Sequence, residues 1–223
     1  MQLSDLRPVS NYAVKYGAKA IVYGGAGSGK TPIAVSTAPR PIMIICEPGM
    51  LSVAKFNVAA ISAFTVADIN DRFAWIFGSN ETKNFDTICI DSISQMCEII
   101  LTDELNKNKD GRKAYGELSR KVMEKLNGLY FMPEKHLYLI CKQQIMVDSN
   151  YKRPFFPGQD LPIKVPHLFD FILHLGIQNV PGVGQVSAFR CNQSIDVLAR
   201  SRTGNLNDFE KPHFGELITK ALG

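Results

Sequence analysis

Short apolar runs alternate along the chain with longer stretches of helical periodicity. Five runs have the length and composition of buried strands: residues 18–23, 41–46, 87–90, 136–141 and 170–175. Between the third and fourth runs, residues 92–105 and 115–129 are predicted to be helical. Strand runs separated by helices are typical of β-α-β units, in which helices cover both faces of a parallel sheet. The pattern therefore predicts an α/β fold with a mainly parallel sheet flanked by helices.

The C-terminal third of the chain departs from this alternation. Two further apolar runs, at about 186–190 and 194–198, are separated by three residues, which predicts a β-hairpin that extends the sheet. Residues 145–166 contain four prolines and Gly158, so we expect a loop without regular structure there. Loops of this length inside a compact domain are usually functional or mobile. At 223 residues the chain fits a single domain, residues 1–223.

Residues 24–31 carry the most specific motif of the sequence. Gly24, Gly25, Ala26, Gly27, Ser28, Gly29, Lys30 and Thr31 match the pattern GxxxxGK[ST] between a predicted strand and a predicted helix. Such a loop points backbone N–H groups at phosphates, the lysine reaches the β- and γ-phosphates, and the hydroxyl binds magnesium. The flanking elements favour this interpretation over a chance glycine-rich turn. The motif predicts binding of ATP with Mg²⁺.

Two carboxylates follow predicted strands. Asp91 ends the third run and is the candidate second magnesium ligand; the alternative is a helix N-cap. Many ATPases of this kind place a glutamate directly after that aspartate, but here Ser92 occupies the position. Glu47, after the second run, is therefore the candidate catalytic carboxylate, and a solvated turn residue is the alternative.

Polar residues also follow the fourth and the last predicted strands. Gln143 or Gln144 could sense the γ-phosphate, although both could equally lie at an ordinary strand exit, and spacing does not choose between them. Arg200 and Arg202 project to the same side of a strand, and guanidinium groups suit phosphate recognition. The alternative for this pair is a solvated sheet edge.

The distribution of charge along the chain is more informative than the net charge. The formal net charge of +4 arises from 25 basic and 21 acidic residues, too small an excess to indicate nucleic acid or an anionic membrane by itself. Basic and aromatic residues mix in two segments, however, which suits single-stranded DNA; a solvated face is the alternative. The first segment contains Lys107, Lys109, Arg112, Lys113, Tyr115, Arg120 and Lys121, and the second contains Tyr151, Lys152, Arg153, Phe155, Phe156 and Lys164.

Cysteine usage and hydropathy predict the cellular compartment. The five cysteines form no CxxC pair, and three lie in apolar runs, as expected for reduced, packed thiols in the cytoplasm. The N-terminus lacks the pattern of a secretory leader, and no segment reaches 18 uninterrupted apolar residues. We therefore expect a cytoplasmic protein without a membrane partner. The four histidines lack ligand spacing with any cysteine, so no structural zinc is predicted.

The ordered set of motifs resembles the RecA-type ATPase core. More closely, it resembles small phage-encoded ATP-binding proteins, RecA relatives of which some act as single-strand annealing recombinases. The resemblance covers roughly residues 18–204 and implies that Glu47 is catalytic and that Gln143 or Gln144 links the γ-phosphate to a DNA-binding loop. It also implies that Arg200 and Arg202 reach the ATP of a neighbouring subunit, where the family pattern is Lys-x-Arg.

The resemblance implies a DNA-stimulated ATPase that binds single-stranded DNA in phage-type recombination or strand annealing, in the host cytoplasm if phage-encoded. Its expected partners are single-stranded DNA, further copies of the chain that share ATP sites, and a single-strand DNA-binding protein. Two alternatives stay open. One is an ATP-dependent switch such as a helicase loader, whose hydrolysis would ignore DNA. The other is a small-molecule phosphotransferase, which needs an arginine-rich lid that the proline-rich segment, with one arginine, does not resemble.

Overall fold

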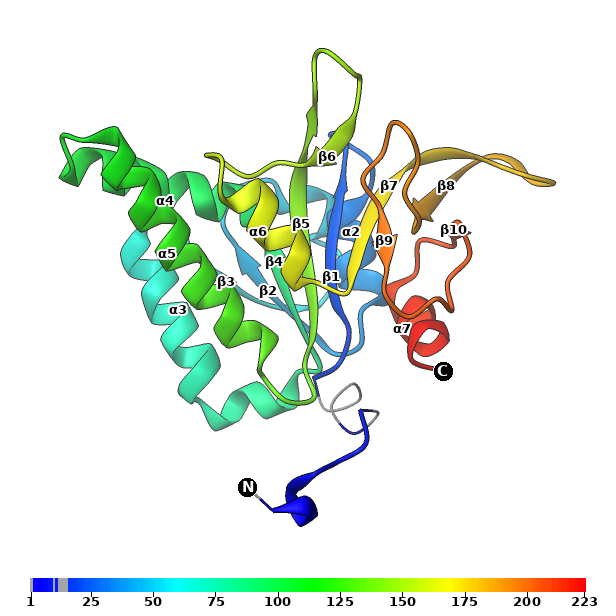
Figure 1. Ribbon diagram of the computed structural model, residues 1–223, viewed down its shortest axis with the longest axis horizontal. Coiled ribbons are helices and arrows are strands. Elements are labelled where there is room, and N and C mark those ends of the chain that lie inside the picture. The colour runs from blue at the N-terminus through cyan, green and yellow to red at the C-terminus, as the bar shows by residue number, and fades with distance from the viewer. Residues whose placement is uncertain (1, 10, 12–15) are drawn as a thin grey trace.

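The computed structural model describes residues 2–9, 11 and 16–223. The described N-terminal part contains a short 3₁₀ helix, η1 (Leu3–Asp5), below the body of the molecule in Figure 1. Residues 1, 10 and 12–15 lie outside the described residues. The stretch in which we expect no secretory leader is therefore described only in part.

A mixed, mainly parallel sheet forms the centre of the fold (Figure 1). Its strand order is β10-β8-β7-β1-β5-β4-β2-β3, with β6 beside β5 and β9 beside β7. The parallel strands are β1 (Lys19–Gly24), β2 (Pro41–Ile45), β3 (Ala59–Ser62), β4 (Thr87–Asp91), β5 (His136–Ile145) and β7 (Phe171–Val180). The antiparallel additions are β6 (Lys152–Pro154), β8 (Gly184–Arg190), β9 (Arg200–Ser201) and β10 (Phe209–Glu210). The predicted α/β class with a mainly parallel sheet is confirmed.

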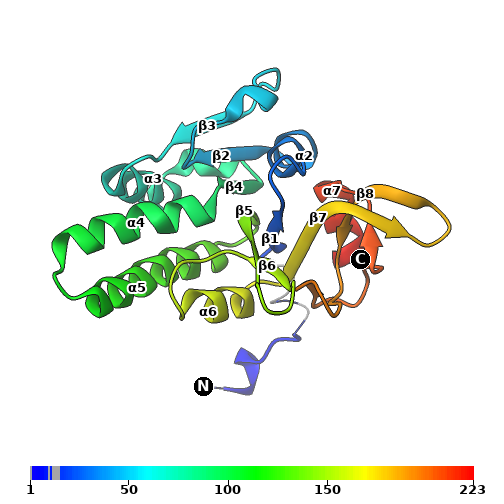
Figure 2. The same ribbon diagram turned by 90° about the horizontal axis from the view of Figure 1, so that it is seen from above.

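Helices cover both faces of this sheet (Figures 1 and 2). One face packs against α2 (Lys30–Thr37) and α7 (Phe214–Leu222). The other packs against α3 (Val66–Gly78), α4 (Ile93–Lys107), α5 (Gly111–Tyr130) and α6 (Leu161–Leu168). Two short 3₁₀ helices, η2 (Met50–Val53) and η3 (Asn80–Asn84), complete the connections. Among the described helices, none combines the length and the apolar character needed to cross a membrane.

Burial on both faces explains why the strands appear in the sequence as continuous apolar runs. In β1, Ile21 and Tyr23 contribute to the core beneath α3–α6, whereas Ala20 and Val22 contribute to the core beneath α2 and α7. Successive side chains of a strand point to opposite faces, so a strand covered on both sides needs apolar residues at every position.

The predicted C-terminal hairpin is wrong in one of its two strands. Residues 184–190 form β8 as expected, but β8 pairs antiparallel with β7 across a turn at residues 181–183. Residues 194–198 form no strand, and Val197 makes only an isolated bridge to Lys152. The sequence does indicate the turn between β7 and β8, because Pro181-Gly182 is a dipeptide typical of turns. Gly182 has a φ of 77°. The apolar run in the sequence ends at residue 175, where Gly176, Gln178 and Asn179 interrupt it, although β7 continues to Val180.

The proline-rich segment is more regular than predicted. β5 continues to Ile145, and β6 folds back on it so that Pro154 lies opposite Gln143. Helix α6 then begins at Leu161, with Pro162 in its first turn. Proline is tolerated at that position because the missing N–H would have no helical partner. Four prolines therefore do not prevent a short strand and a two-turn helix here.

Candidate nucleotide-binding site

The loop that follows β1 has the backbone form of a phosphate-binding loop. Gly27 and Gly29 adopt φ angles of 75° and 94°, a region that glycine enters at little cost. Gly24 is restricted by space, since a Cβ there would lie 2.2 Å from the carbonyl oxygen of Leu175. The loop leads directly into α2, whose N-terminal N–H groups favour an anion. The glycine pattern therefore reflects backbone requirements at each of these three positions.

Lys30 is held over this loop. Its Nζ donates to the carbonyl oxygens of Gly24 and Gly25, both at 2.9 Å, and to Ser28 Oγ at 3.3 Å. Burial lowers the pKa of the Lys30 ammonium, while the nearby charge of Asp91 acts in the opposite direction. A cation that is partly buried and held only by neutral groups is well placed to pair with a phosphate.

Asp91 ends β4 beside the loop and is 3 % exposed. Its Oδ2 accepts a hydrogen bond of 2.5 Å from Thr31 Oγ1. Burial raises the pKa of the Asp91 carboxyl, opposed by the Thr31 hydrogen bond and the charge of Lys30. The N-cap alternative for Asp91 is wrong, because α4 is capped by Ser92, whose Oγ accepts from the backbone N–H of Gln95 at 3.2 Å. The peptide bond between Asp91 and Ser92 is cis.

The donor set formed by Thr31 and Asp91 fits a magnesium ion. The hydroxyl and the carboxylate are adjacent hard oxygen ligands next to the phosphate loop. Magnesium in nucleotide sites is bound by one or two protein oxygens together with phosphate oxygens and water. The buried carboxylate would also be stabilised in its charged form by a divalent cation. Thr31 and Asp91 are therefore the residues that would hold the ion.

A pocket of about 560 Å³, called here the nucleotide pocket, is lined by the phosphate loop together with Glu47, Asp91, Ser92, Lys142 and Gln143. It brings the predicted residues Lys30, Thr31, Glu47, Asp91 and Gln143 to one place. The other predicted site residues, Gln144, Arg200 and Arg202, do not line it.

Lys142 is a pocket residue that the sequence analysis did not single out. Its Nζ lies 4.0 Å from Glu47 Oε2, 2.5 Å from Glu98 Oε2 and 2.8 Å from Gln95 Oε1. The only sequence signal was its position as the first polar residue after the buried run of β5. Lys142 thus lies between the pocket carboxylate Glu47 and the α4 residues Gln95 and Glu98.

The structure separates the two glutamines of β5. Consecutive residues on a strand point to opposite faces. Gln143 lines the nucleotide pocket, and its Oε1 lies 3.0 Å from His174 Nε2. Gln144 instead accepts a hydrogen bond from Arg153 Nε at 2.9 Å. Gln143 is therefore the glutamine placed to meet a nucleotide.

Arg200, in β9, and Arg202, just after it, lie toward the opposite end of the strands from the phosphate loop. Arg200 pairs with Ile172 near the start of β7, and the backbone N–H of Arg202 donates to the Asp170 carbonyl oxygen at 3.2 Å. The backbone N–H of Asp170 in turn donates to the carbonyl oxygen of Lys19, the first residue of β1, whereas the loop follows the last residue of that strand.

Both guanidinium groups bind carbonyl oxygens around the end of α6. Arg200 donates to Phe169 at 2.7 Å and to Pro166, and its Nε is buried without a partner within the described chain. Arg202 donates to His167 and lies 3.4 Å from Asp170 Oδ1. Arg202 is the more accessible of the two: its side chain is 41 % exposed, whereas Arg200 is partly buried.

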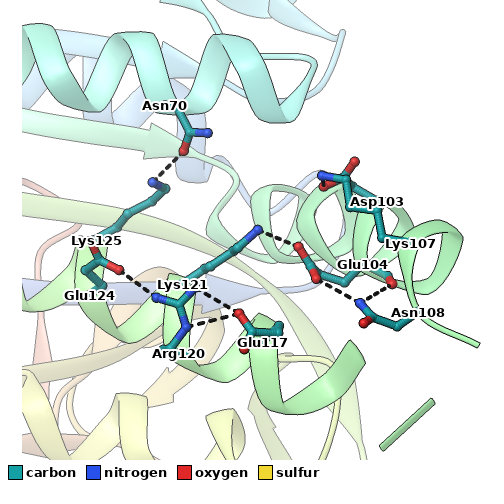
Figure 3. Close-up of polar contacts among 10 residues, drawn as sticks. All are labelled: Asn70, Asp103, Glu104, Lys107, Asn108, Glu117, Arg120, Lys121, Glu124 and Lys125. Atoms are coloured by element: carbon teal, nitrogen blue, oxygen red, sulfur yellow. Dashed lines mark hydrogen bonds and ion pairs between the residues drawn. The ribbon is translucent and has the colours of Figure 1, made fainter. Parts of the chain in front are cut away.

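Half of the basic residues in the first predicted DNA segment are already paired (Figure 3). The pairs are Lys107 with Asp103 at 2.5 Å, Arg120 with Glu117 at 2.8 Å and Lys121 with Glu104 at 2.5 Å. Arg112 and Lys113, exposed at the start of α5, form no ion pair within residues 2–9, 11 and 16–223. Together with Lys109, which is also exposed and in no ion pair among the described residues, they are the cations of this segment that a phosphate could reach without breaking a pair.

The second predicted DNA segment contains a core residue. Phe156 is 2 % exposed and packs in the core beneath α3–α6, which contradicts its predicted role in stacking on bases. Phe155 is partly buried. Lys152 lies 3.5 Å from Asp196 Oδ2, and Arg153 is engaged with Gln144. Aromatic residues in a proline-rich segment look alike in sequence, so the burial of one of them could not be predicted.

A second cavity, of about 860 Å³, joins the two segments. This α5 cavity is lined by Arg112, Tyr115 and Ser119 from α5 and by residues 157–161 before and at the start of α6. Tyr115 is 44 % exposed and lies over Gly158, where a Cβ would come within 3.0 Å of its ring. An aromatic ring and an unpaired arginine therefore border one hollow.

His174, on β7 beside Gln143, is expected to make the free energy of unfolding depend on pH. It is 8 % exposed, and burial lowers its pKa to about 4, with the charges of Lys152 and Arg190 adding to the effect. An unfolded histidine has a pKa near 6.5, so from about pH 6.5 down to pH 4 only the unfolded chain gains the proton. This histidine should cost the fold on the order of 3 kcal/mol over that range, and no more below it.

The measurement is urea unfolding at several pH values between 7 and 4. We expect His174→Gln to lose less stability than the wild type on acidification, because the titrating group is gone. His213→Gln, at the N-cap of α7, is the control for the removal of a histidine from another part of the chain. Parallel wild-type and His174→Gln curves would show that His174 does not titrate as stated.

The fold and the nucleotide pocket define a P-loop nucleotide-binding core. The chain belongs to the AAA domain family, whose model matches residues 16–203. Solved structures similar to this chain include a KaiC-like protein from the hyperthermophilic archaeon Pyrococcus horikoshii, with 16% identity over 78% of this chain and 77% of that chain and a TM-score of 0.47. Another is the RadB recombinase, with 16% identity, 80% and 82% coverage and a TM-score of 0.49. No curated protein matches the sequence.

Proposed function

We propose that this chain hydrolyses ATP with Mg²⁺ and that single-stranded DNA stimulates the reaction. The observation that carries the proposal is the convergence of Lys30, Thr31, Asp91, Glu47 and Gln143 on one pocket. Lys30 would pair with the β- and γ-phosphates, and Thr31 and Asp91 would hold magnesium, which would neutralise phosphate charge. Lys30 suits its role because it is held by neutral groups, and Thr31 and Asp91 suit theirs because they are already hydrogen-bonded to each other.

Glu47 serves as the general base in this proposal. Within the described residues, the carboxylates that line the pocket are Glu47 and Asp91. Asp91 is engaged by Thr31 and assigned to the metal, so Glu47 remains to accept a proton from the attacking water. Ser92, next to Asp91, acts as a helix cap and has no carboxylate.

The proposed DNA site is the α5 cavity. Tyr115 would stack on a base, and Arg112 and Lys113 would bind phosphates, a combination typical of single-strand binding. The cavity is joined to the nucleotide pocket by the chain itself, because β5 and β6 lead from Gln143 to residues 157–161. The backbone N–H of Phe155 also donates to the Lys142 carbonyl oxygen at 2.8 Å. This continuity supports stimulation of hydrolysis by DNA.

The proposed biological role is recombination or strand annealing of the phage type, by an assembly of copies that share ATP sites. A single-strand DNA-binding protein is the expected accessory partner. The test of the whole proposal is ATP hydrolysis measured with and without single-stranded DNA at two salt concentrations. Hydrolysis indifferent to DNA would favour the switch, and phosphate transfer that requires a small acceptor would favour the phosphotransferase.

Variants of the α5 cavity should separate stacking from charge. Tyr115→Ala is expected to weaken single-strand binding by about 1–3 kcal/mol with little change in its salt dependence, because a stacked base is lost. Arg112→Ala with Lys113→Ala should instead flatten the salt dependence, since fewer counterions are released. Fluorescence anisotropy with a labelled oligonucleotide at several salt concentrations measures both.

The controls lie on the same helix. Tyr115→Phe retains the ring and should bind as the wild type does. Arg120→Ala removes a cation that is already paired with Glu117 and Glu124, and should leave the salt dependence nearly unchanged. A change in salt dependence for Arg120→Ala as large as that for Arg112→Ala with Lys113→Ala would mean that helix charge in general, and not this cavity, attracts DNA.

A further inference from the structure

Side-chain hydrogen bonds lead from the nucleotide pocket to the β7–β8 hairpin. Gln143 Oε1 lies 3.0 Å from His174 Nε2, and His174 Nδ1 lies 3.1 Å from Gln178 Nε2. Gln143 lines the pocket, whereas Gln178 lies in the outer half of β7. Figures 1 and 2 both show the hairpin extending away from the body of the molecule. A pocket residue is thus connected to a projecting element through one histidine.

The strand order explains how Gln143 and His174 meet. β1 lies between β5 and β7 and ends at Gly24, while both neighbours continue. Tyr23 is in register with His174 on one side and Cys141 on the other, so Gln143, two residues after Cys141, shares the face of His174. The side chains therefore pair across the end of β1, just where the phosphate loop leaves the sheet.

The three side chains have one self-consistent hydrogen-bond pattern. An amide oxygen accepts and an amide nitrogen donates, and a neutral imidazole has one nitrogen of each kind. Gln143 Oε1 must accept from His174 Nε2–H, and His174 Nδ1 must then accept from Gln178. Burial and the surrounding cations Lys30, Lys152 and Arg190, opposed by Asp196, keep the ring neutral. The ring thus has a fixed tautomer.

This pattern leaves the amide nitrogen of Gln143 available. Within the described residues, no hydrogen bond is made by that nitrogen, while its oxygen is engaged by His174. Two N–H donors of Gln143 are then free for an acceptor in the nucleotide pocket. A γ-phosphate oxygen is an acceptor that ATP has and ADP lacks.

The remaining surroundings fix the histidine in place. The Tyr23 ring packs 5.1 Å from the His174 ring, and the Tyr23 hydroxyl donates to the Leu198 carbonyl oxygen at 2.7 Å. Gly176 lies between His174 and Gln178 on the same face of β7. A Cβ there would be 3.5 Å from His174 Cε1 and 3.8 Å from Gln178 Nε2, so a longer side chain would fill the space in which the two meet.

We propose that His174 is the positioning residue that turns the Gln143 amide toward the γ-phosphate and transmits the presence of that phosphate to the β7–β8 hairpin. The inference rests on the proposed function of the nucleotide pocket. His174 itself does not line the pocket and acts through Gln143. ATP, but not ADP, should therefore alter the hairpin.

The first test compares His174→Leu with His174→Gln in nucleotide binding and turnover. His174→Leu should lower the preference for a non-hydrolysable ATP analogue over ADP about tenfold, with ADP affinity retained, because one hydrogen bond to phosphate loses its orientation. kcat should fall more than KM rises. His174→Gln can donate its amide N–H to Gln143 and should recover most of the preference.

The second test follows the hairpin directly. Hydrogen exchange of residues 176–187 should slow with the ATP analogue relative to ADP in the wild type, and this difference should disappear in Gln178→Ala. Gln185→Ala, exposed on β8 of the same hairpin, is the matched control and should retain it. In ¹⁵N-histidine spectra, the His174 signals should carry the Nε2–H tautomer signature and shift with the analogue only.

The outcomes distinguish the inference from the function on which it rests. An unchanged analogue preference in His174→Leu, or an unchanged hairpin response in Gln178→Ala, would overturn the role of His174 while leaving ATP hydrolysis intact. A wild type that discriminates the analogue from ADP through His174 but turns over no ATP would support the inference and reject the hydrolytic function. A wild type that binds both nucleotides equally would overturn the inference.

Discussion

Glu47→Gln is expected to bind ATP as the wild type does and to hydrolyse it at least about a hundredfold more slowly, the usual scale for loss of a general base. The substitution preserves the size and shape of the side chain but removes the charge and the ability to accept a proton. The carboxylate stands in the nucleotide pocket at the end of β2, with Lys142 4.0 Å away. Phosphate release, measured alongside the affinity for an ATP analogue, separates the chemical step from binding.

A neighbouring carboxylate provides the control for this prediction. Glu98 contacts the same Lys142, at 2.5 Å, but does not line the pocket. Glu98→Gln should therefore retain most of the activity. Normal turnover in Glu47→Gln would place the base elsewhere and remove the main argument for a RecA-like hydrolytic site. A loss of ATP affinity equal to the loss of rate would instead assign Glu47 to binding.

The parts of the fold that the sequence predicts well are those fixed by local requirements. β1, β2 and β4 are buried on both faces, so each needs an unbroken apolar run that is visible in the sequence. β3 was missed because this edge strand is short and largely exposed, with Ala59, Ala60 and Ser62 among its four residues. Helix α3 was also missed, although Thr65 and Asp68 form a capping box that a search for helix starts would have found.

The site residues that the sequence predicts well are likewise those fixed by local requirements. Lys30 and Thr31 belong to a motif whose spacing is set by one loop, and Asp91 ends a buried strand beside it. The choice between Gln143 and Gln144 depends on the face of β5 each occupies, which follows from a strand that continues to Ile145. Such information comes from pairing with β6 and is not contained in the local pattern.

Pairing between distant residues is the other feature that the sequence concealed. Lys121 binds Glu104 from an adjacent helix, and Arg200 binds carbonyl oxygens 31 and 34 residues earlier in the chain. Neither can be distinguished from a free cation by its neighbours in sequence. His174 likewise meets Gln143 from 31 residues away. Its importance becomes visible only when β1 is seen to end between them.

Arg202→Ala is expected to lose about 10³ to 10⁵ in the rate of ATP hydrolysis by the assembled protein, the range found for arginine fingers, and to retain ATP binding. Arg202 cannot reach its own pocket, because it lies level with Lys19 at the start of β1, about 16 Å along the strand from the loop that follows Gly24. Any contact of Arg202 with ATP would therefore be with the ATP of a neighbouring copy. Turnover per subunit should rise with protein concentration or with DNA that drives assembly.

Arg200→Ala is the matched control. Its guanidinium is occupied by the carbonyl oxygens of Pro166 and Phe169, so its loss should lower the free energy of unfolding by about 1–3 kcal/mol. The rate of the assembled variant should change far less than that of Arg202→Ala. The opposite order of effects would make Arg200 the residue that crosses between subunits.

Mixing Arg202→Ala with Glu47→Gln tests the sharing of sites directly. Each variant alone should be nearly inactive, since every site lacks either the base or the arginine. In a mixed assembly, some sites combine Glu47 of an Arg202→Ala subunit with Arg202 of a Glu47→Gln subunit, and these sites are complete. Activity should therefore return on mixing, with a maximum near equal amounts. No recovery, in a mixture shown by cross-linking to co-assemble, would mean that Arg202 does not complete a neighbour's site and that its contacts with Asp170 and His167 are structural.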